Sequence, residues 1–278
     1  MNCKNPFPVK NEDGSVRFLV GCGKCHYCRI QRCNEWALRG MHELTAWHGK
    51  ATFLTLTIAD EFMYGESVYK SSVQKFLKRL RKRLGCKLRY VAVGEYGGES
   101  GRPHYHLIVY GLDPYSDSHF EAVQDCWKYC YWSFMDRANV YKEVNYQNIR
   151  YLFKYMWKKS NVEDVNPPFM LCSKGIGRDW IDKHSSEVEE KLSISYRGVE
   201  LGVPRYYRGR LSPTFDKNYQ NKCKTQQDTN YLQFVENNQD NVSNLIRQFG
   251  DLKTAYGFKL KQQADLKNLM LKDFENEN

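Results

Sequence analysis

The chain has 278 residues, enough to bury a sizeable core in one large domain or in one domain with appendages. No apolar stretch approaches the roughly 20 residues that a membrane-spanning helix needs, and the N-terminal residues lack the apolar segment of a signal peptide. These features predict a soluble intracellular protein. Its 42 Lys and Arg residues outnumber 32 Asp and Glu residues, giving a formal charge of +10, and 20 tyrosines accompany them. Positive charge with many aromatic rings favours a nucleic-acid partner.

The segment CGKCHYCRIQRC near the N-terminus carries four of the ten cysteines, namely Cys22, Cys25, Cys28 and Cys33. The C-x-x-C spacing lets two thiolates of one tight turn occupy two corners of a tetrahedral metal site, and Cys28 can supply the third ligand. The fourth is either Cys33, on a helix-like segment, or Cys3, brought in by the intervening chain. We interpret the pattern as a structural zinc site, with an iron–sulfur cluster or reduced free cysteines as alternatives.

The middle of the chain predicts a short run of alternating elements. Residues 51–59 alternate apolar side chains with a face that carries threonines, which is typical of a strand. Residues 71–85 have apolar positions at helical spacing, residues 88–97 form a second strand, and a third strand opens at His104 after a glycine-rich loop. The last two strands should form an antiparallel hairpin. The order favours an α+β fold with helices on one face of the sheet.

The remainder of the chain is less regular. We expect a helix around residues 118–129, a strand at 139–144, a helix at 145–159, a loop at 167–177 and an irregular basic segment at 202–213. Residues beyond 218 are rich in Gln and Asn and include a helical pattern. The predicted organisation is therefore a Cys-rich module with its helix (1–50), a catalytic core (51–217) and a polar helical tail (218–278).

Positive charge is concentrated in one part of the chain. Nine Lys or Arg residues and no acid lie between residues 67 and 94. A charge run is usually a solvated face, but one without acids favours a polyanion nearby. The predicted DNA-binding residues are Lys75, Lys78, Arg79, Arg81, Lys82, Arg83, Arg205 and Arg208.

The segment RPHYHLIVYG places two histidines one residue apart at the head of the third strand. Because side chains alternate along a strand, His104 and His106 project to the same side and offer half of a divalent metal site. The alternative is a pair of hydrogen-bonded strand histidines. Glu95, at the end of the second strand, is the first choice for a third ligand, and Glu99 in the loop is the second. A phosphate substrate is best activated by a divalent ion with open coordination positions.

The helix in IRYLFKYMWKK offers candidate nucleophiles. Tyr151 and Tyr155 are four residues apart, so their hydroxyls project from one helical face, and each has a lysine three residues later, Lys154 and Lys158. A phenol has a pKa near 10 and attacks poorly at neutral pH, so a polarised phosphate and adjacent ammonium groups would both help. The alternative is an amphipathic helix that uses its tyrosines for packing.

Three motifs in this order, FLTLT, GRPHYHLIVYG and YLFKYMWKK, resemble those of the two-tyrosine HUH endonucleases. The similarity extends to the replication initiators of gokushoviruses, small circular single-stranded DNA phages of the Microviridae, and covers nearly everything from Met1 to about Leu211. The blocks that carry it are MNCKNP, CGKCHYCR, EWALRGMHE, FLKRLRKRL, GEYGGESGRPHYH, SKGIGRDW and VPRYYRGRL.

The resemblance implies an HUH-type antiparallel sheet and a site-specific single-strand endonuclease and strand transferase that initiates rolling-circle replication. Tyr151 or Tyr155 would attack origin DNA, leaving a 5′-phosphotyrosine and a 3′-hydroxyl primer, and the other tyrosine would support rejoining. Mg²⁺ or Mn²⁺ held by Glu95, His104 and His106 would bind the scissile phosphate.

The resemblance also implies the partners and the zinc ligands. It groups Cys3 with Cys22, Cys25 and Cys28 around zinc and leaves Cys33 as the alternative. The partners are single-stranded or nicked circular DNA, a host helicase and a host DNA polymerase, in the host bacterial cytoplasm and without a membrane. No nucleotide-binding loop is visible in the sequence, so unwinding would fall to the helicase.

Other functions use parts of the same pattern. A non-enzymatic zinc-ribbon regulator of DNA needs the cysteines and the basic helix, but neither His-x-His nor paired tyrosines. A relaxase or single-strand transposase of the same superfamily often needs one tyrosine. A metal hydrolase would cut without a covalent intermediate.

Overall fold

The structure is a computed structural model that describes residues 3, 5–10, 12–63, 67–97, 101–154, 165–260 and 262–263. The chain divides into two units, one built from residues 1–32 and 185–278 and the other from residues 33–184. Of the helices in the described ranges, none is long and apolar enough to cross a membrane. The predicted boundaries at residues 50 and 217 stay a prediction.

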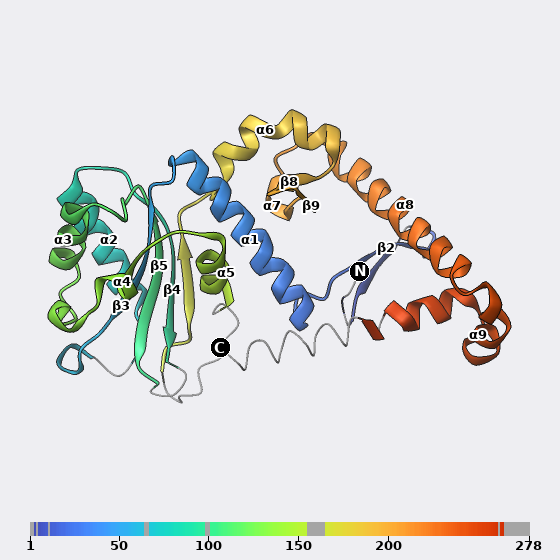
Figure 1. The fold of residues 1–278 in the computed structure, drawn as a ribbon, viewed down its shortest axis with the longest axis horizontal. Helices are drawn as coiled ribbons and strands as arrows, with labels where there is room; N and C mark the ends of the chain where they lie inside the picture. The colour runs from blue at the N-terminus through green and yellow to red at the C-terminus, as the bar shows by residue number, and fades with distance from the viewer. Residues whose placement is uncertain are drawn as a thin grey trace. The chain divides into compact units, whose positions relative to one another are not determined.

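Five strands form the central sheet of the 33–184 unit (Figure 1). They are β3 (Ala51–Thr57), β4 (Arg89–Tyr96), β5 (Pro103–Tyr110), β6 (Tyr141–Glu143) and β7 (Phe169–Cys172). Their order is β6-β3-β5-β4-β7, and every neighbouring pair is antiparallel. The expected α+β class, with an antiparallel β4–β5 hairpin, is confirmed.

Helices cover both faces of this sheet (Figure 1). The helices α2 (Lys70–Leu84) and α3 (Asp117–Cys126) pack on one face, while α1 (His26–Ala46) and α5 (Tyr146–Lys154) pack on the other. The prediction of helices on one face only was wrong.

The strands themselves explain this correction, because both of their faces are apolar. Ala92 and Leu107 belong to the core under α2 and α3, whereas Val91, Val93 and Ile108 belong to the core under α1 and α5. A sheet with one solvated face would alternate apolar with polar residues instead.

The strand β7 is a second correction, since residues 167–177 were expected to be a loop. Phe169 to Cys172 pair with Gly94 to Val91 of β4 and complete that edge of the sheet. A Cβ atom on Gly94 would lie 2.6 Å from the Phe169 ring, so a glycine permits this close pairing. A four-residue apolar run bounded by prolines and glycines carries too little periodicity to distinguish such a strand from a loop.

The basic helix α2 formed as the sequence predicts. Val73, Phe76, Leu77 and Leu80 are its buried residues. It ends at Gly85, which has a left-handed backbone (φ 64°) and donates its N–H to the last turn.

Other short elements complete the two units. Within 33–184 they are α4 (Arg137–Val140) and the 3₁₀ turns η1 (Asp60–Phe62) and η2 (Trp132–Phe134). The unit of residues 1–32 and 185–278 holds the hairpins β1–β2 (Phe7–Lys10, Val16–Val20) and β8–β9 (Ile194–Tyr196, Val199–Leu201). Its helices include α7 (Arg205–Arg208), α8 (Phe215–Glu236) and α9 (Val242–Phe249), with a 3₁₀ turn η4 (Gln239–Asn241), and α6 (Arg178–Lys191) runs from one unit into the other. The basic segment 202–213 thus contains one helical turn.

Candidate active site

The β4–β5 hairpin brings the predicted metal ligands together. In its register Glu95 lies opposite His104, and His106 lies opposite Thr55 of β3. Since side chains two apart on a strand share a face, both imidazoles project to the side of the sheet that α5 covers. The placement follows from the two strands and from the glycine-containing connection between them.

Glu95 lies at the centre of this group. Its Oε1 atom is 2.8 Å from Nε2 of His104 and 3.1 Å from Nε2 of His106, and the two imidazole centroids are 5.0 Å apart. Glu95 is 1% exposed and His106 is 6% exposed. One ligand atom from each residue can be chosen so that all three lie within 4.8 Å of one another. The group therefore has the dimensions of a metal centre.

The outer imidazole nitrogens are already held. His104 Nδ1 lies 3.1 Å from the Arg102 carbonyl oxygen, which can only accept, so this nitrogen carries the proton. A neutral His104 then turns the Nε2 lone pair toward the Glu95 carboxylate, an arrangement that a cation stabilises. His106 Nδ1 lies 3.2 Å from the Thr55 hydroxyl. Partners of this kind fix ring orientation in metal sites.

The second oxygen of Glu95 supports the same interpretation. Among the described residues, Glu95 Oε2 is buried without a hydrogen-bond partner. Burial raises the pKa of Glu95, but hydrogen bonds and charge from His104 and His106 outweigh it, so its pKa is lowered. A buried, charged carboxylate with one unengaged oxygen and two imidazoles fits a divalent cation.

Tyr151 of α5 lies beside this group. Its ring centroid is 5.8 Å from that of His106, at 77° to it, and the residue is 44% exposed. The helix is anchored on its other side by the buried residues Ile149, Leu152 and Phe153. A phenol hydroxyl that solvent reaches is therefore carried next to a candidate metal centre.

Several predicted site residues lie outside what the structure describes. Tyr155, Lys158 and the alternative ligand Glu99 are in undescribed positions, and Lys154 ends α5 with no described side chain. The roles predicted for them stay predictions.

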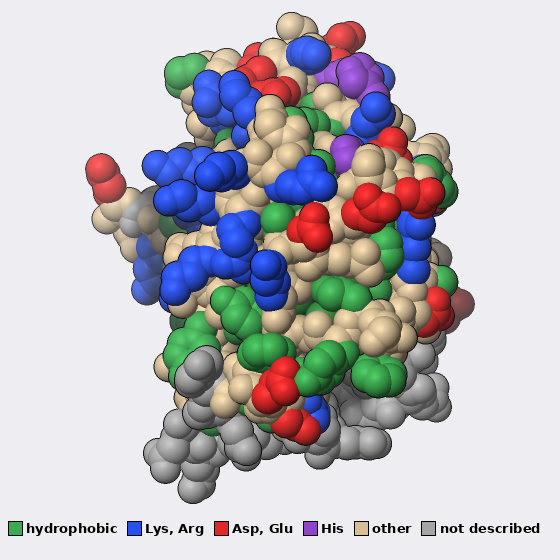
Figure 2. All heavy atoms as spheres, turned by 90° about the vertical axis from the view of Figure 1, so that its left-hand side faces the viewer, with side chains coloured by type: hydrophobic (Ala, Val, Ile, Leu, Met, Phe, Trp, Pro, Cys, Tyr) green, Lys and Arg blue, Asp and Glu red, His purple; other side chains and the backbone are tan. Residues whose placement is uncertain are grey.

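The basic residues of α2 lie across the sheet from the two histidines, because α2 packs on the opposite face. Figure 2 shows Lys and Arg side chains gathered on that side of the molecule. Two of the arginines are engaged in the fold: Arg79 donates twice to the Cys126 carbonyl, and Arg81 donates twice to the Leu88 carbonyl.

The other predicted DNA-binding residues are more exposed. Lys75, Lys78 and Lys82 are exposed on α2, and Arg83 pairs with Asp125 at 3.3 Å. In the other unit, Arg205 is exposed, whereas Arg208 lies 3.5 Å from Asp216. The predicted DNA-binding residues are thus divided between the two units.

The four cysteines at the N-terminus form a second candidate metal centre. Cys3, Cys22, Cys25 and Cys28 offer sulfur atoms within 4.8 Å of one another, and the Sγ atoms of Cys3 and Cys25 are 3.9 Å apart. Tetrahedral zinc with Zn–S bonds of about 2.3 Å places its sulfurs about 3.8 Å apart. Cys33 is not in this group and is buried in the core under α1 and α5.

The thiols of this centre have shifted pKa values. The backbone N–H of Cys25 lies 3.3 Å from Cys22 Sγ and is the main reason why the pKa of Cys22 falls to about 6. Burial raises the pKa of Cys28 to about 12. One thiolate at neutral pH is already available for a metal, and metal binding would have to displace the proton from the other.

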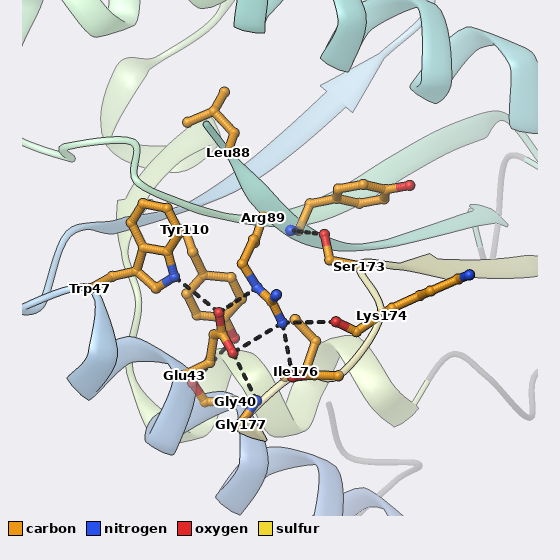
Figure 3. A network of polar contacts seen from close by, with 12 residues as sticks. Gly40, Glu43, Trp47, Leu88, Arg89, Tyr110, Ser173, Lys174, Ile176 and Gly177 are labelled. Atoms are coloured by element: carbon orange, nitrogen blue, oxygen red, sulfur yellow. Dashed lines mark hydrogen bonds and ion pairs between the residues drawn. The ribbon is translucent and has the colours of Figure 1, made fainter. Parts of the chain in front are cut away.

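A buried network that the sequence did not predict ties α1 to β4 and to the turn before α6 (Figure 3). Arg89 Nε lies 2.6 Å from Glu43 Oε1, which also accepts from Trp47 Nε1 at 2.9 Å, and Glu43 Oε2 accepts from the Gly177 backbone at 2.8 Å. Arg89 also donates to the Lys174 carbonyl at 3.0 Å. The residues lie in the segments EWALRGMHE and SKGIGRDW and in β4, so sequence spacing alone does not reveal their contact.

The comparisons with known proteins agree with this site. Residues 51–160, from β3 through α5, match the family model of the replication-associated protein ORF2. The chain is 27% identical over 255 residues to replication-associated protein ORF2 of Spiroplasma virus 4, covering 84% of this chain and 77% of that protein.

Two further relatives are also phage replication-associated proteins. Protein VP4 of Bdellovibrio phage phiMH2K is 28% identical over 212 residues, which are 69% of this chain and 67% of that protein. Protein ORF4 of Chlamydia phage 1 is 25% identical over 241 residues, which are 74% and 58% of the two chains. No solved structure matches the chain. The expected resemblance to phage replication-associated proteins is confirmed.

Proposed function

From this similarity to phage replication-associated proteins, we propose that the chain is an HUH-type endonuclease that initiates rolling-circle replication by nicking and rejoining circular phage DNA at its origin. One observation carries the proposal: the exposed phenol of Tyr151 lies beside the cluster of Glu95, His104 and His106. A nucleophile, a divalent-ion site and a basic protein surface are the parts that this reaction needs.

Nicking would transfer a phosphoryl group to a tyrosine. The Tyr151 oxygen forms a bond to the scissile phosphorus, the bond from phosphorus to the 3′ oxygen breaks, and the phenol proton ends on the released 3′ oxygen. The products are a 5′-phosphotyrosine and a 3′-hydroxyl that primes synthesis. Glu95, His104 and His106 would hold Mg²⁺ or Mn²⁺, which when bound neutralises charge on the phosphate.

Rejoining would use the second tyrosine of the motif, Tyr155, with the roles reversed. Tyr155 would cleave the regenerated junction, and the newly released 3′-hydroxyl would attack the first phosphotyrosine and close the circle. The phosphotyrosine link conserves the energy of the broken bond, so closure needs no nucleotide. Lys154 and Lys158 would stabilise the phenolate forms of the two tyrosines.

The remaining predicted features would support DNA binding. Zinc held by Cys3, Cys22, Cys25 and Cys28 would stabilise the N-terminal module. The exposed lysines of α2 and Arg205 would contact phosphates away from the nick, while Arg79 and Arg81 are held by backbone carbonyls. A host helicase and DNA polymerase in the bacterial cytoplasm would unwind and copy the DNA.

The test is a search for a covalent protein–DNA adduct. Purified protein is incubated with Mn²⁺ and labelled circular single-stranded phage DNA, and adducts that survive denaturation are resolved on a gel. Wild type is compared with Tyr151→Phe, Tyr155→Phe and the double variant, and Tyr146→Phe on the same helix is the matched control. We expect wild type and Tyr146→Phe to form the adduct and the double variant to form none.

Other outcomes identify other functions. DNA binding without an adduct, across ions and candidate origins, would contradict the proposal and favour a zinc-ribbon regulator. Cleavage that survives in the double variant would favour a metal hydrolase. Circle closure by a single-tyrosine variant would favour a relaxase or transposase-like activity.

A further inference from the structure

A pocket of about 520 Å³ opens beside His104 in the 33–184 unit. It is formed by the end of β3, the start of β5 and the segment around η2. Its lining includes Thr57, Arg102, His104, Tyr131, Phe134 and Met135. His104 also contacts Glu95 through Nε2, so one imidazole is shared by the pocket and the candidate metal centre.

Two aromatic rings at this pocket are exposed to solvent. Phe134 is 83% exposed and Tyr131 is 49% exposed, and their rings meet edge to face with centroids 6.1 Å apart. A phenylalanine so exposed gains almost nothing from folding, whereas a flat ligand could cover it. Nucleobases stack on such rings irrespective of sequence.

The turn that carries these rings is held in place. The backbone N–H of Phe134 donates to the Tyr131 carbonyl at 3.1 Å, and that of Met135 donates to the Trp132 carbonyl at 3.0 Å. The Trp132 indole donates to the Trp127 carbonyl at 2.9 Å, and Trp127 is fully buried. The aromatic platform is therefore presented by a turn that is anchored in the core.

The charge at the pocket suits a neutral ring better than a phosphate. Among the described lining residues, Arg102 carries the permanent positive charge, and it pairs with Asp60 at 2.7 Å. Arg102 also donates to the Ile58 carbonyl at 3.0 Å. A phosphate would compete with Asp60 for the guanidinium, while a base would contact the rings and the Thr57 hydroxyl.

We propose that this pocket holds one unpaired nucleobase with its sugar, from the nucleotide next to the scissile phosphate. The inference rests on the proposed function, since it places that phosphate at the metal centre. The volume lies within the range of about 300–1,000 Å³ typical of small-molecule sites. Because His104 is common to both sites, a base in the pocket positions the adjoining phosphate. The pocket then contributes to the choice of nick site.

The test measures binding apart from cleavage. Fluorescence anisotropy gives the Kd of a short fluorescein-labelled oligodeoxythymidine, without added divalent ion, for wild type and Phe134→Ala. Tyr115→Ala is the matched control, because Tyr115 is 75% exposed on the same unit and does not line the pocket. We expect Phe134→Ala to raise the Kd roughly 10-fold, the effect of losing one stacked base, and Tyr115→Ala to leave it unchanged.

Photocrosslinking locates the contact. An oligonucleotide that carries 5-iododeoxyuridine is irradiated with the protein, and we expect the label on the tryptic peptide of residues 129–137, which contains Tyr131 and Phe134. An unchanged Kd in Phe134→Ala, or crosslinks confined to other peptides, would overturn the pocket.

The two proposals can fail separately. If the pocket binds oligonucleotide but wild type forms no adduct with origin DNA, nicking is wrong and base binding stands. If Phe134→Ala forms adduct as fast as wild type at subsaturating DNA, nicking stands and the pocket is wrong. Because Phe134 is so exposed, its replacement should not unfold the protein, and the thermal midpoint checks this.

Discussion

Glu43 and Glu95 are two buried carboxylates of the same unit, 3% and 1% exposed, with opposite surroundings. Both oxygens of Glu43 are engaged, by Arg89, by the Trp47 indole and by the Gly177 backbone. Glu95 faces two imidazoles through one oxygen, and its other oxygen is buried without a partner among the described residues. Glu43 joins three parts of the fold, whereas Glu95 has capacity to bind something more.

The difference separates structural from functional burial of charge. Removing a carboxylate from water costs several kcal/mol unless hydrogen bonds and opposite charge replace the lost hydration. Glu43 receives that replacement from the protein. Glu95 receives it in part, and a cation would supply the rest. Satisfaction of both oxygens, and not burial, therefore distinguishes the two sites.

The largest effect is expected for Glu95→Gln. The variant keeps the shape of the side chain but removes its charge, so adduct formation should fall by at least about 100-fold. The free energy of unfolding should change by less than about 1 kcal/mol, because the fold does not depend on this charge. Saturating Mn²⁺ should raise the thermal midpoint of wild type but not of Glu95→Gln. An equal Mn²⁺ response in both proteins would contradict the assignment of Glu95 as a ligand.

The converse is expected for Glu43→Gln. The change leaves Arg89, whose side chain is 31% exposed, without its partner, so the free energy of unfolding should fall by about 3 kcal/mol in urea titrations. Mn²⁺ affinity should stay at the wild-type value at a temperature where the variant is folded. Glu43→Gln combined with Arg89→Met should recover part of the loss. A variant as stable as wild type would show that the network does not hold the fold.

The smallest effect tests the support of the site. Thr55→Val removes the hydroxyl beside His106 Nδ1 without changing side-chain size, and Mn²⁺ affinity should fall about 10-fold, as measured by calorimetry. Thr52→Val is the matched control on the same strand, because the Thr52 hydroxyl donates to the Leu112 carbonyl, away from the site. It should lower stability by about 1 kcal/mol and leave Mn²⁺ affinity unchanged. Equal affinities in all three proteins would remove Thr55 from the site.

Local periodicity predicted the parts of the site that lie on single elements. Alternation along β5 places His104 and His106 on one face, and helical spacing explains the buried face of α2. The hairpin also limited the choice of a third ligand, because Glu95 is the acid at the end of β4. Each of these inferences depends on neighbours within about ten residues, where backbone geometry alone sets direction.

Contacts between distant segments were harder to predict. The pairing of β7 with β4, and that of Glu43 with Arg89, join residues dozens of positions apart, and no local pattern marks either one. Residue composition suggested two choices for the fourth cysteine, and only the chain path groups Cys3 with the other three.

The sequence by itself determined the chemistry available to this protein: the two imidazoles on one strand face, the acid beside them, the tyrosine helix, the four-cysteine module and the basic helix. Tertiary structure decided which of these groups meet. It placed Tyr151 beside His106, α2 on the opposite face of the sheet, and the aromatic pocket against His104. The physical reason is that dihedral preferences and side-chain periodicity act over a few residues, whereas strand pairing and core packing act between segments that the sequence keeps apart.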